Sequence, residues 1–214
     1  MIKKTILFLS FAILCFSCNG NFVSSNDTQL YIKSKSEFNS RLTEHFPKTL
    51  TTYPYTIINN KNLSKNTVGF MLCEFEKDSV KIDSVIRSIQ KKIIGKYNFK
   101  DPCLLIVNRF ETAETFEERK DVVITDSTKI NQDCYKKLFP IPNFLEFNSD
   151  EYTSNSKFDE SFDIYVLEAK AGNYFKEFDL LTDLQMPKEW ENGYSKGIAI
   201  SKKKKMIIYW GIIW

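Results

Sequence analysis

The sequence of 214 residues contains only 7 glycines and a single histidine. It has no glycine-rich phosphate loop, so the usual signature of nucleotide-binding proteins is missing. The three cysteines beyond the leader form no C-x-x-C pair, and no histidine–carboxylate spacing occurs, which removes the common zinc and redox motifs. The sequence therefore indicates no catalytic, cofactor-binding or metal-binding residues.

The chain also lacks an excess of charge of either sign. It carries 30 Lys and Arg residues against 27 Asp and Glu residues. Without Lys3 and Lys4 the balance is 28 − 27 = +1. Binding of nucleic acid needs a concentrated basic surface, so we expect no nucleic-acid partner. The 18 phenylalanines and 10 tyrosines are typical of a folded globular chain rather than a disordered one.

The first apolar run, Ile6 to Phe16, is too short to cross a bilayer. A spanning helix needs roughly 20 apolar residues. Lys3 and Lys4 precede the run, and small and polar residues follow it from Ser17. A basic start before an apolar stretch of ~7–15 residues predicts a secretory signal peptide.

The leader resembles the signal peptide of bacterial lipoproteins over residues 1–18. In that class the peptidase cuts before a cysteine, which becomes the first residue and carries the acyl chains; the resemblance assigns this lipidation to Cys18. The usual motif has Leu three residues before the cysteine and Gly or Ala directly before it, whereas Cys15, Phe16 and Ser17 stand here. Ordinary cleavage with release of the protein, and an uncleaved anchor, are the two alternatives.

The resemblance divides the chain into a signal peptide over 1–17, a lipidated cysteine with a flexible tether over 18–29, and one globular domain over 30–214. The 214 − 17 = 197 residues left after cleavage suit a single domain. The residue after the cysteine is Asn19 and the first acid is Asp27. In the lipoprotein class this pattern implies the outer membrane, with the domain facing the periplasm.

Three cysteines remain beyond the leader: Cys73, Cys103 and Cys134. Cys73 and Cys103 lie in apolar runs that read as strands, which favours buried small hydrophobic side chains. A disulfide between two of the three is the alternative in an oxidising compartment. The sequence does not select the pair.

Hydrophobic periodicity predicts helices and strands in mixed order. We expect helices over 34–46, 82–97 and 111–120. We expect strands over 55–59, 68–76, 103–110, 122–125 and 162–169, and a C-terminal β-hairpin from 197–201 and 206–214. This order predicts an α+β fold, with an antiparallel or mixed sheet and a few packed helices.

The candidate chemical residues have ordinary structural explanations. His45 is expected at a helix C-terminus, where the helix dipole alone suits a histidine, so we assign it no catalytic role. Glu74 and Glu76 would share one face of a strand, which we expect to be the solvated face. Lys202–Lys205 reads as a solvated hairpin turn, with contact to anionic lipid heads as the functional alternative.

Four aromatic residues near the C-terminus have two interpretations. We expect them to pack the C-terminal hairpin, and the alternative is that their rings form a sugar-binding surface. These residues are Trp190, Tyr194, Tyr209 and Trp210.

Together these observations predict a cell-envelope lipoprotein attached to the lipid bilayer through acylated Cys18. Its domain would be a non-enzymatic module that binds an envelope protein, peptide or glycan, toxin immunity being one specific version. The alternative is a membrane-anchored hydrolase of envelope polymers. Its mark would be a deep cleft that gathers His45, or two carboxylates with raised pKa values.

Overall fold

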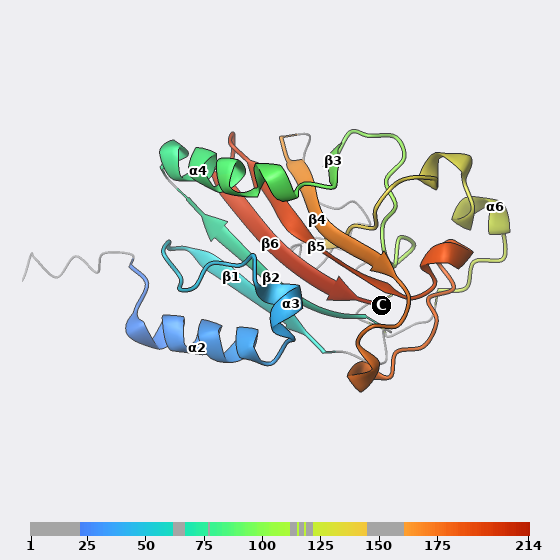
Figure 1. Ribbon diagram of the computed structural model, residues 1–214, viewed down its shortest axis with the longest axis horizontal. Coiled ribbons are helices and arrows are strands. Elements are labelled where there is room, and N and C mark those ends of the chain that lie inside the picture. The colour runs from blue at the N-terminus through green and yellow to red at the C-terminus, as the bar shows by residue number, and fades with distance from the viewer. Residues whose placement is uncertain are drawn as a thin grey trace, which may run out of the picture.

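The structure is a computed structural model that describes residues 22–61, 67–76, 78–111, 115, 118, 122–144 and 161–214. A six-stranded antiparallel sheet organises it, in the spatial order β1-β2-β6-β5-β4-β3 (Figure 1). The strands are β1 (Tyr55–Asn60), β2 (Val68–Phe75), β3 (Gly95–Asn98), β4 (Asp163–Ala171), β5 (Gly193–Ser201) and β6 (Met206–Ile213). The predicted α+β fold with a C-terminal hairpin, β5–β6, is confirmed.

Helices cover one face of the sheet and mostly irregular chain covers the other (Figure 1). The helical face carries α2 (Ser25–Ser36), α3 (Ser40–Thr43) and α4 (Ser79–Ile89). Short helical pieces complete the chain: η2 (Gln90–Lys92), α6 (Ser127–Ile130), η3 (Asp133–Tyr135), η5 (Lys176–Phe178) and η6 (Lys188–Trp190).

Apolar side chains are buried on both faces of the sheet. On the helical face the core includes Tyr31, Leu42, Phe70, Ile82 and Tyr209. On the opposite face it includes Leu105, Ile141, Trp190, Trp210 and Trp214. Because both faces are covered, the central strand β6 is apolar at nearly every position instead of alternating.

The helix expected over 34–46 is divided in two. The chain leaves α2 at Ser36 and begins α3 at Ser40. α2 also starts earlier than expected, at Ser25, inside the segment 18–29 that was expected to be a flexible tether. The Ser24 hydroxyl accepts from the Asp27 amide at 3.1 Å, and the Asp27 carboxylate accepts from the Ser24 amide at 2.9 Å. This reciprocal cap is a local sequence signal for a helix start.

The helix expected over 82–97 is too long. α4 ends at Ile89, and Tyr97 lies in β3 instead of on a helical face. The amide of Ile94 donates to the carbonyl of Val166 at 2.9 Å, and β3 then pairs with β4. Pairing with a distant strand therefore overrides the local helical pattern.

The strands expected over 103–110 and 122–125 do not form. Segment 103–110 is largely buried but irregular. Its β-type pairing among the described residues is one isolated parallel bridge, between Ile106 and Ile141. The strands expected over 55–59, 68–76 and 162–169 are confirmed. The expected helix over 111–120 falls almost entirely outside the described residues.

One glycine permits the contact between α3 and the sheet. A Cβ atom at Gly211 of β6 would lie 2.6 Å from Leu42 Cγ and 2.7 Å from the Leu42 carbonyl oxygen. Because Gly211 has no side chain, α3 lies directly on the strand. This close approach brings the charged residues of α3 onto β4 and β5.

Candidate functional site

Cys103 and Cys134 form a disulfide, with Cα atoms 6.1 Å apart. The expectation that Cys103 is a buried free thiol is therefore wrong: it is only half-buried, at the entry to the irregular segment. Cys73 is buried and free, as expected. Burial, together with nearby Glu74, raises the pKa of the Cys73 thiol to about 12, so this thiol is not a reactive nucleophile.

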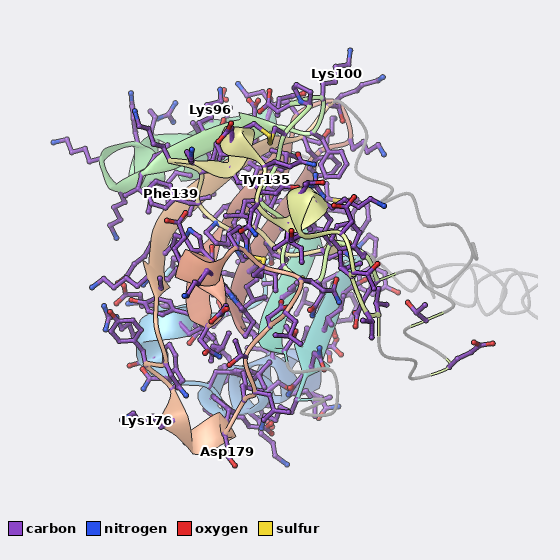
Figure 2. The ribbon with its side chains drawn as sticks, turned by 90° about the vertical axis from the view of Figure 1, so that its right-hand side faces the viewer. Lys96, Lys100, Tyr135, Phe139, Lys176 and Asp179 are labelled. Carbon is purple, nitrogen blue, oxygen red and sulfur yellow. A yellow bond between two sulfur atoms is a disulfide. The ribbon has the colours of Figure 1, made fainter. Side chains whose placement is uncertain are left out.

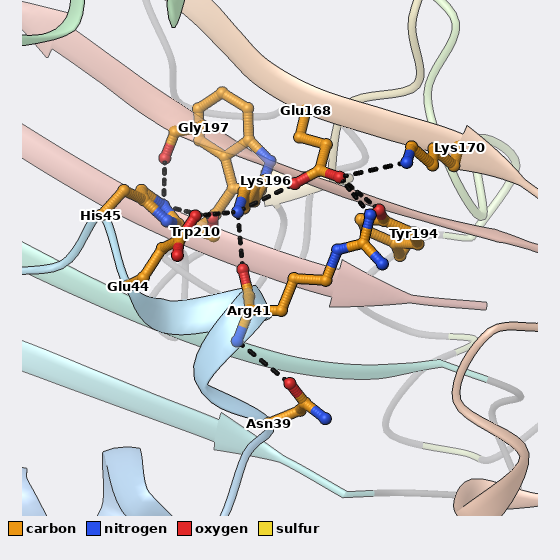
Figure 3. Close-up of polar contacts among 10 residues, drawn as sticks. All are labelled: Asn39, Arg41, Glu44, His45, Glu168, Lys170, Tyr194, Lys196, Gly197 and Trp210. Carbon is orange, nitrogen blue, oxygen red and sulfur yellow. Dashed lines mark hydrogen bonds and ion pairs between the residues drawn. The ribbon is translucent and has the colours of Figure 1, made fainter.

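Lys196 of β5 is the centre of a charged cluster between α3 and the sheet (Figure 3). Its side chain is only 4% exposed. The ammonium lies 3.0 Å from Glu168 Oε2 and 2.8 Å from Glu44 Oε1, and it donates to the Arg41 carbonyl at 2.6 Å. A buried charge requires such partners, so this lysine fastens α3 to the sheet.

Glu168 of β4 connects this cluster to the surface. It pairs with Arg41 at 2.6 Å and accepts from the Tyr194 hydroxyl at 2.6 Å (Figure 3). Burial alone would raise the pKa of Glu168, but hydrogen bonds from Tyr194, Arg41 and Lys196 outweigh it and lower the pKa to about 2. The carboxylate is therefore fully ionised and fully engaged, which suits a structural clamp better than a general acid or base.

His45 follows α3 and is held against the central hairpin. Its Nε2 lies 3.1 Å from the carbonyl oxygen of Gly197 and 2.9 Å from that of Trp210 (Figure 3). Since both neighbours are acceptors, Nε2 carries the proton. Burial, and then the charge of Lys196, lower the pKa of His45 to about 3. His45 is thus a neutral, half-buried donor whose Nε2 proton is held by two carbonyl oxygens of the central hairpin.

Glu74 and Glu76 are buried, at 3% and 6% exposed, so the expectation that they face solvent is wrong. The chain before β1 covers them: the Thr51 amide donates to Glu74 Oε1 at 3.3 Å. Burial raises the pKa of Glu74. Glu76 accepts from the Asp78 amide at 2.9 Å and lies 3.5 Å from the Lys81 ammonium. These contacts attach the covering chain and the start of α4 to the end of β2.

An open groove of about 440 Å³ lies in the irregular chain that covers the face of the sheet opposite the helices. One proline, one tyrosine and five polar or charged residues line it: Asn131, Gln132, Tyr135, Lys136, Pro187, Lys188 and Glu189. Neither His45 nor the buried carboxylates contribute to it. The groove has one carboxylate, that of Glu189, and does not gather the pair of carboxylates with raised pKa values expected of a hydrolase.

The connection between β4 and β5, residues 172–192, presents two leucines to solvent. Leu181 is 78% exposed and Leu184 is 77% exposed. The backbone between them is held in place, since the Asp183 amide donates to the Glu191 carbonyl at 2.7 Å and the Asn192 amide group donates to the Leu181 carbonyl at 3.2 Å. We call Leu181 and Leu184 the leucine pair.

Sequence reasoning missed the leucine pair. Its only signal was two leucines within a polar loop, which periodicity does not interpret.

In Figure 2, Lys176 and Asp179 of the connection between β4 and β5 lie at the lower edge of the molecule, and Tyr135 lies in its upper half. The connection around Asp179 is therefore well separated from the groove at Tyr135.

The four C-terminal aromatic residues pack the hairpin, as expected. All are buried, which rules out the alternative of a sugar-binding surface made from Trp190, Tyr194, Tyr209 and Trp210. The indole of Trp214 donates to the Trp190 carbonyl at 2.7 Å and closes this part of the core.

Within the described ranges, no three His, Cys, Asp or Glu side chains come together as a metal site. In the same part of the chain, every helix is too short or too polar to cross a bilayer. Comparison of the chain with protein-family models, with curated proteins and with solved structures finds no match.

Proposed function

We propose that this protein is a cell-envelope lipoprotein whose folded domain is a non-enzymatic binding module. The leader up to Cys18 supports the anchor, which would hold the domain at the outer membrane on its periplasmic side. Two or more acyl chains on one cysteine make attachment stable, at ~0.8 kcal/mol per buried CH₂.

The Cys103–Cys134 disulfide supports export. Disulfides form and persist in oxidising compartments such as the periplasm and are rare in the cytosol. The half-buried and exposed positions of these two cysteines make an oxidising environment the natural setting for the pair.

The observation that carries the binding role is the leucine pair. Two neighbouring leucines, 78% and 77% exposed on a hydrogen-bonded backbone, offer an apolar contact surface to a protein partner. Because the backbone is already ordered, less conformational entropy is lost on binding than for a mobile loop. We propose an envelope protein with an apolar recess as the partner of the leucine pair.

The alternative, an anchored hydrolase, has in its favour the pKa values of Glu74 and Asp183, which burial raises. However, Glu74 is only 3% exposed and Asp183 only 5% exposed, and each already accepts an amide hydrogen. A hydrolase would need an opening to these residues, and neither of them lines the groove at Tyr135.

Two measurements in intact cells test the proposal. Metabolic labelling with an alkyne analogue of palmitate should mark the wild-type protein and leave Cys18→Ser unlabelled. A photo-crosslinking amino acid at position 181 or 184 should give one discrete protein adduct, whereas the same group at the exposed position 91 should give none. An unlabelled wild-type protein would remove the anchor. Equal adducts at all three positions, or no adduct at 181 and 184, would remove the binding role.

A further inference from the structure

The β5–β6 turn, Lys202–Lys205, lies at the same end of the molecule as the beginnings of α2 and α4 (Figure 1). The strand register explains this placement. Ser201 pairs with Met206 across the turn, Met206 pairs with Phe75 at the end of β2, and Tyr55 at the start of β1 pairs with Glu74. A hydrogen bond between the side chains of Tyr55 and Asp27 then brings the first turn of α2 to this end.

The surface at this end is basic. All four lysines of the turn are exposed. Together with Lys81 they make five exposed cations, against the three carboxylates at this end that are not buried, which are Asp27, Asp78 and Asp83; Glu74 and Glu76 are buried. The difference, 5 − 3 = +2, remains although Lys202 pairs with Asp83 at 2.7 Å.

Exposed apolar and aromatic groups accompany these charges. Val80, in the first turn of α4, is 66% exposed, and Tyr53, just before β1, is also exposed. We call the surface formed by Lys202–Lys205, Val80 and Tyr53 the basic end. Lysine beside tyrosine and an aliphatic residue is the composition found where proteins meet the headgroup region of a membrane.

The distance along the chain restricts where the basic end can lie. Six residues, 19–24, separate Cys18 from the start of α2, and fully extended they span about 20 Å at ~3.3–3.6 Å per residue. α2 is itself fixed to the body, because the Tyr31 hydroxyl and the Lys35 ammonium donate to the Pro47 carbonyl at 2.6 Å and 2.7 Å. A lipid on Cys18 would therefore hold this end of the domain close to the bilayer.

We propose that the basic end docks on the anionic lipid headgroups of the bilayer that holds the Cys18 anchor. The inference rests on the proposed lipidation and deepens it by assigning a membrane-facing surface. The lysine ammonium groups contact the lipid phosphates, and Val80 and Tyr53 lie at headgroup depth. The leucine pair is at the opposite end of the sheet, since its loop follows Ala171, and so it faces away from the membrane.

Vesicle binding by the unlipidated protein tests this surface directly. The chain from residue 18, carrying Cys18→Ser, keeps the whole described body, which begins at residue 22. It should sediment with phosphatidylglycerol vesicles at low salt, release at high salt, and ignore phosphatidylcholine vesicles. K203Q/K204Q should weaken binding at least tenfold, since each lysine contributes roughly fivefold near an anionic surface. K176Q/K188Q removes two exposed lysines from the opposite end and should bind as the parent does.

The outcomes separate this inference from the anchor. Failure of the parent chain to bind anionic vesicles, or equal losses in the two double variants with unchanged circular dichroism, would overturn the basic end. Palmitate labelling of the full chain decides lipidation independently. Labelling without vesicle binding would support the lipid anchor at Cys18 and reject the basic end as a docking surface. Vesicle binding without labelling would support the docking surface and reject the anchor.

Discussion

At the scale of single residues, the ionisable side chains around α3 bind other groups of the protein. Lys196, Glu168 and His45 would each attract attention as chemical groups in a sequence. In the structure Lys196 and Glu168 neutralise one another and fasten α3, and His45 donates to carbonyl oxygens of the central hairpin. The contacts that bury these groups engage the Lys196 ammonium, the Glu168 carboxylate and His45 Nε2, whereas His45 Nδ1 is buried without a hydrogen-bond partner.

His45 should make stability depend on pH. Its pKa is about 3 in the folded state against 6.5 in the unfolded chain. Between these two pKa values the unfolded state binds a proton at His45 and the native state does not. The contribution of His45 to the free energy of unfolding is therefore fully present above pH 6.5 and is lost as the pH drops toward 3. The slope is about 1.4 kcal/mol per pH unit, which gives a loss of ~2 kcal/mol between about pH 7 and about pH 5.

Urea unfolding at these two pH values measures the loss. His45→Gln retains an N–H donor for the two carbonyl oxygens but does not titrate, so it should lose about 2 kcal/mol less than the wild type over this interval. The carboxylates are shared by both proteins and cancel in the comparison. Equal losses would show that His45 is not the group responsible.

At the scale of elements, local pattern and tertiary contact compete. The strands β2 and β4 and the C-terminal hairpin were predictable, because their apolar runs are long enough to identify. The run 103–110 is equally apolar but does not become a strand, since the disulfide and the bridge at Ile141 hold it as an irregular cover. Periodicity reports burial in such a run but not the partner that buries it.

The disulfide should be a main stabiliser of this cover. It closes a loop with a sequence separation of 31, for which chain entropy gives a stabilisation of about 2–4 kcal/mol. The variant C103S/C134S should lose that much free energy of unfolding, and reductant should lower the stability of the wild type but not of the variant. Alkylation followed by peptide mass analysis provides the check: either cysteine modified in protein isolated without reductant would contradict the bond.

At the scale of the whole molecule, two cores share one sheet. All three tryptophans, Trp190, Trp210 and Trp214, belong to the core on the irregular face. The longer helices α2 and α4 lie on the other face. Since β5 and β6 contribute side chains to both cores, neither face can unfold while the other keeps its strands.

This arrangement predicts one cooperative transition. Tryptophan fluorescence reports the irregular face, and far-ultraviolet circular dichroism reports chiefly the helices of the other face. Their urea midpoints should coincide, as in two-state unfolding of a single domain. Separate midpoints would mean that α2 and α4 detach before the tryptophan core opens.

The sequence by itself determined the class of fold, the central hairpin and the expectation of an anchor at Cys18, because these depend on runs of neighbouring residues. Tertiary structure decided that Tyr97 is in a strand, that Glu74 and Glu76 are covered, and that Cys103 meets Cys134. It also brought the lysine turn to the end of the molecule where α2 begins. Each of these outcomes depends on contacts between segments far apart in the chain, and local pattern carries no record of which distant segment will supply the partner.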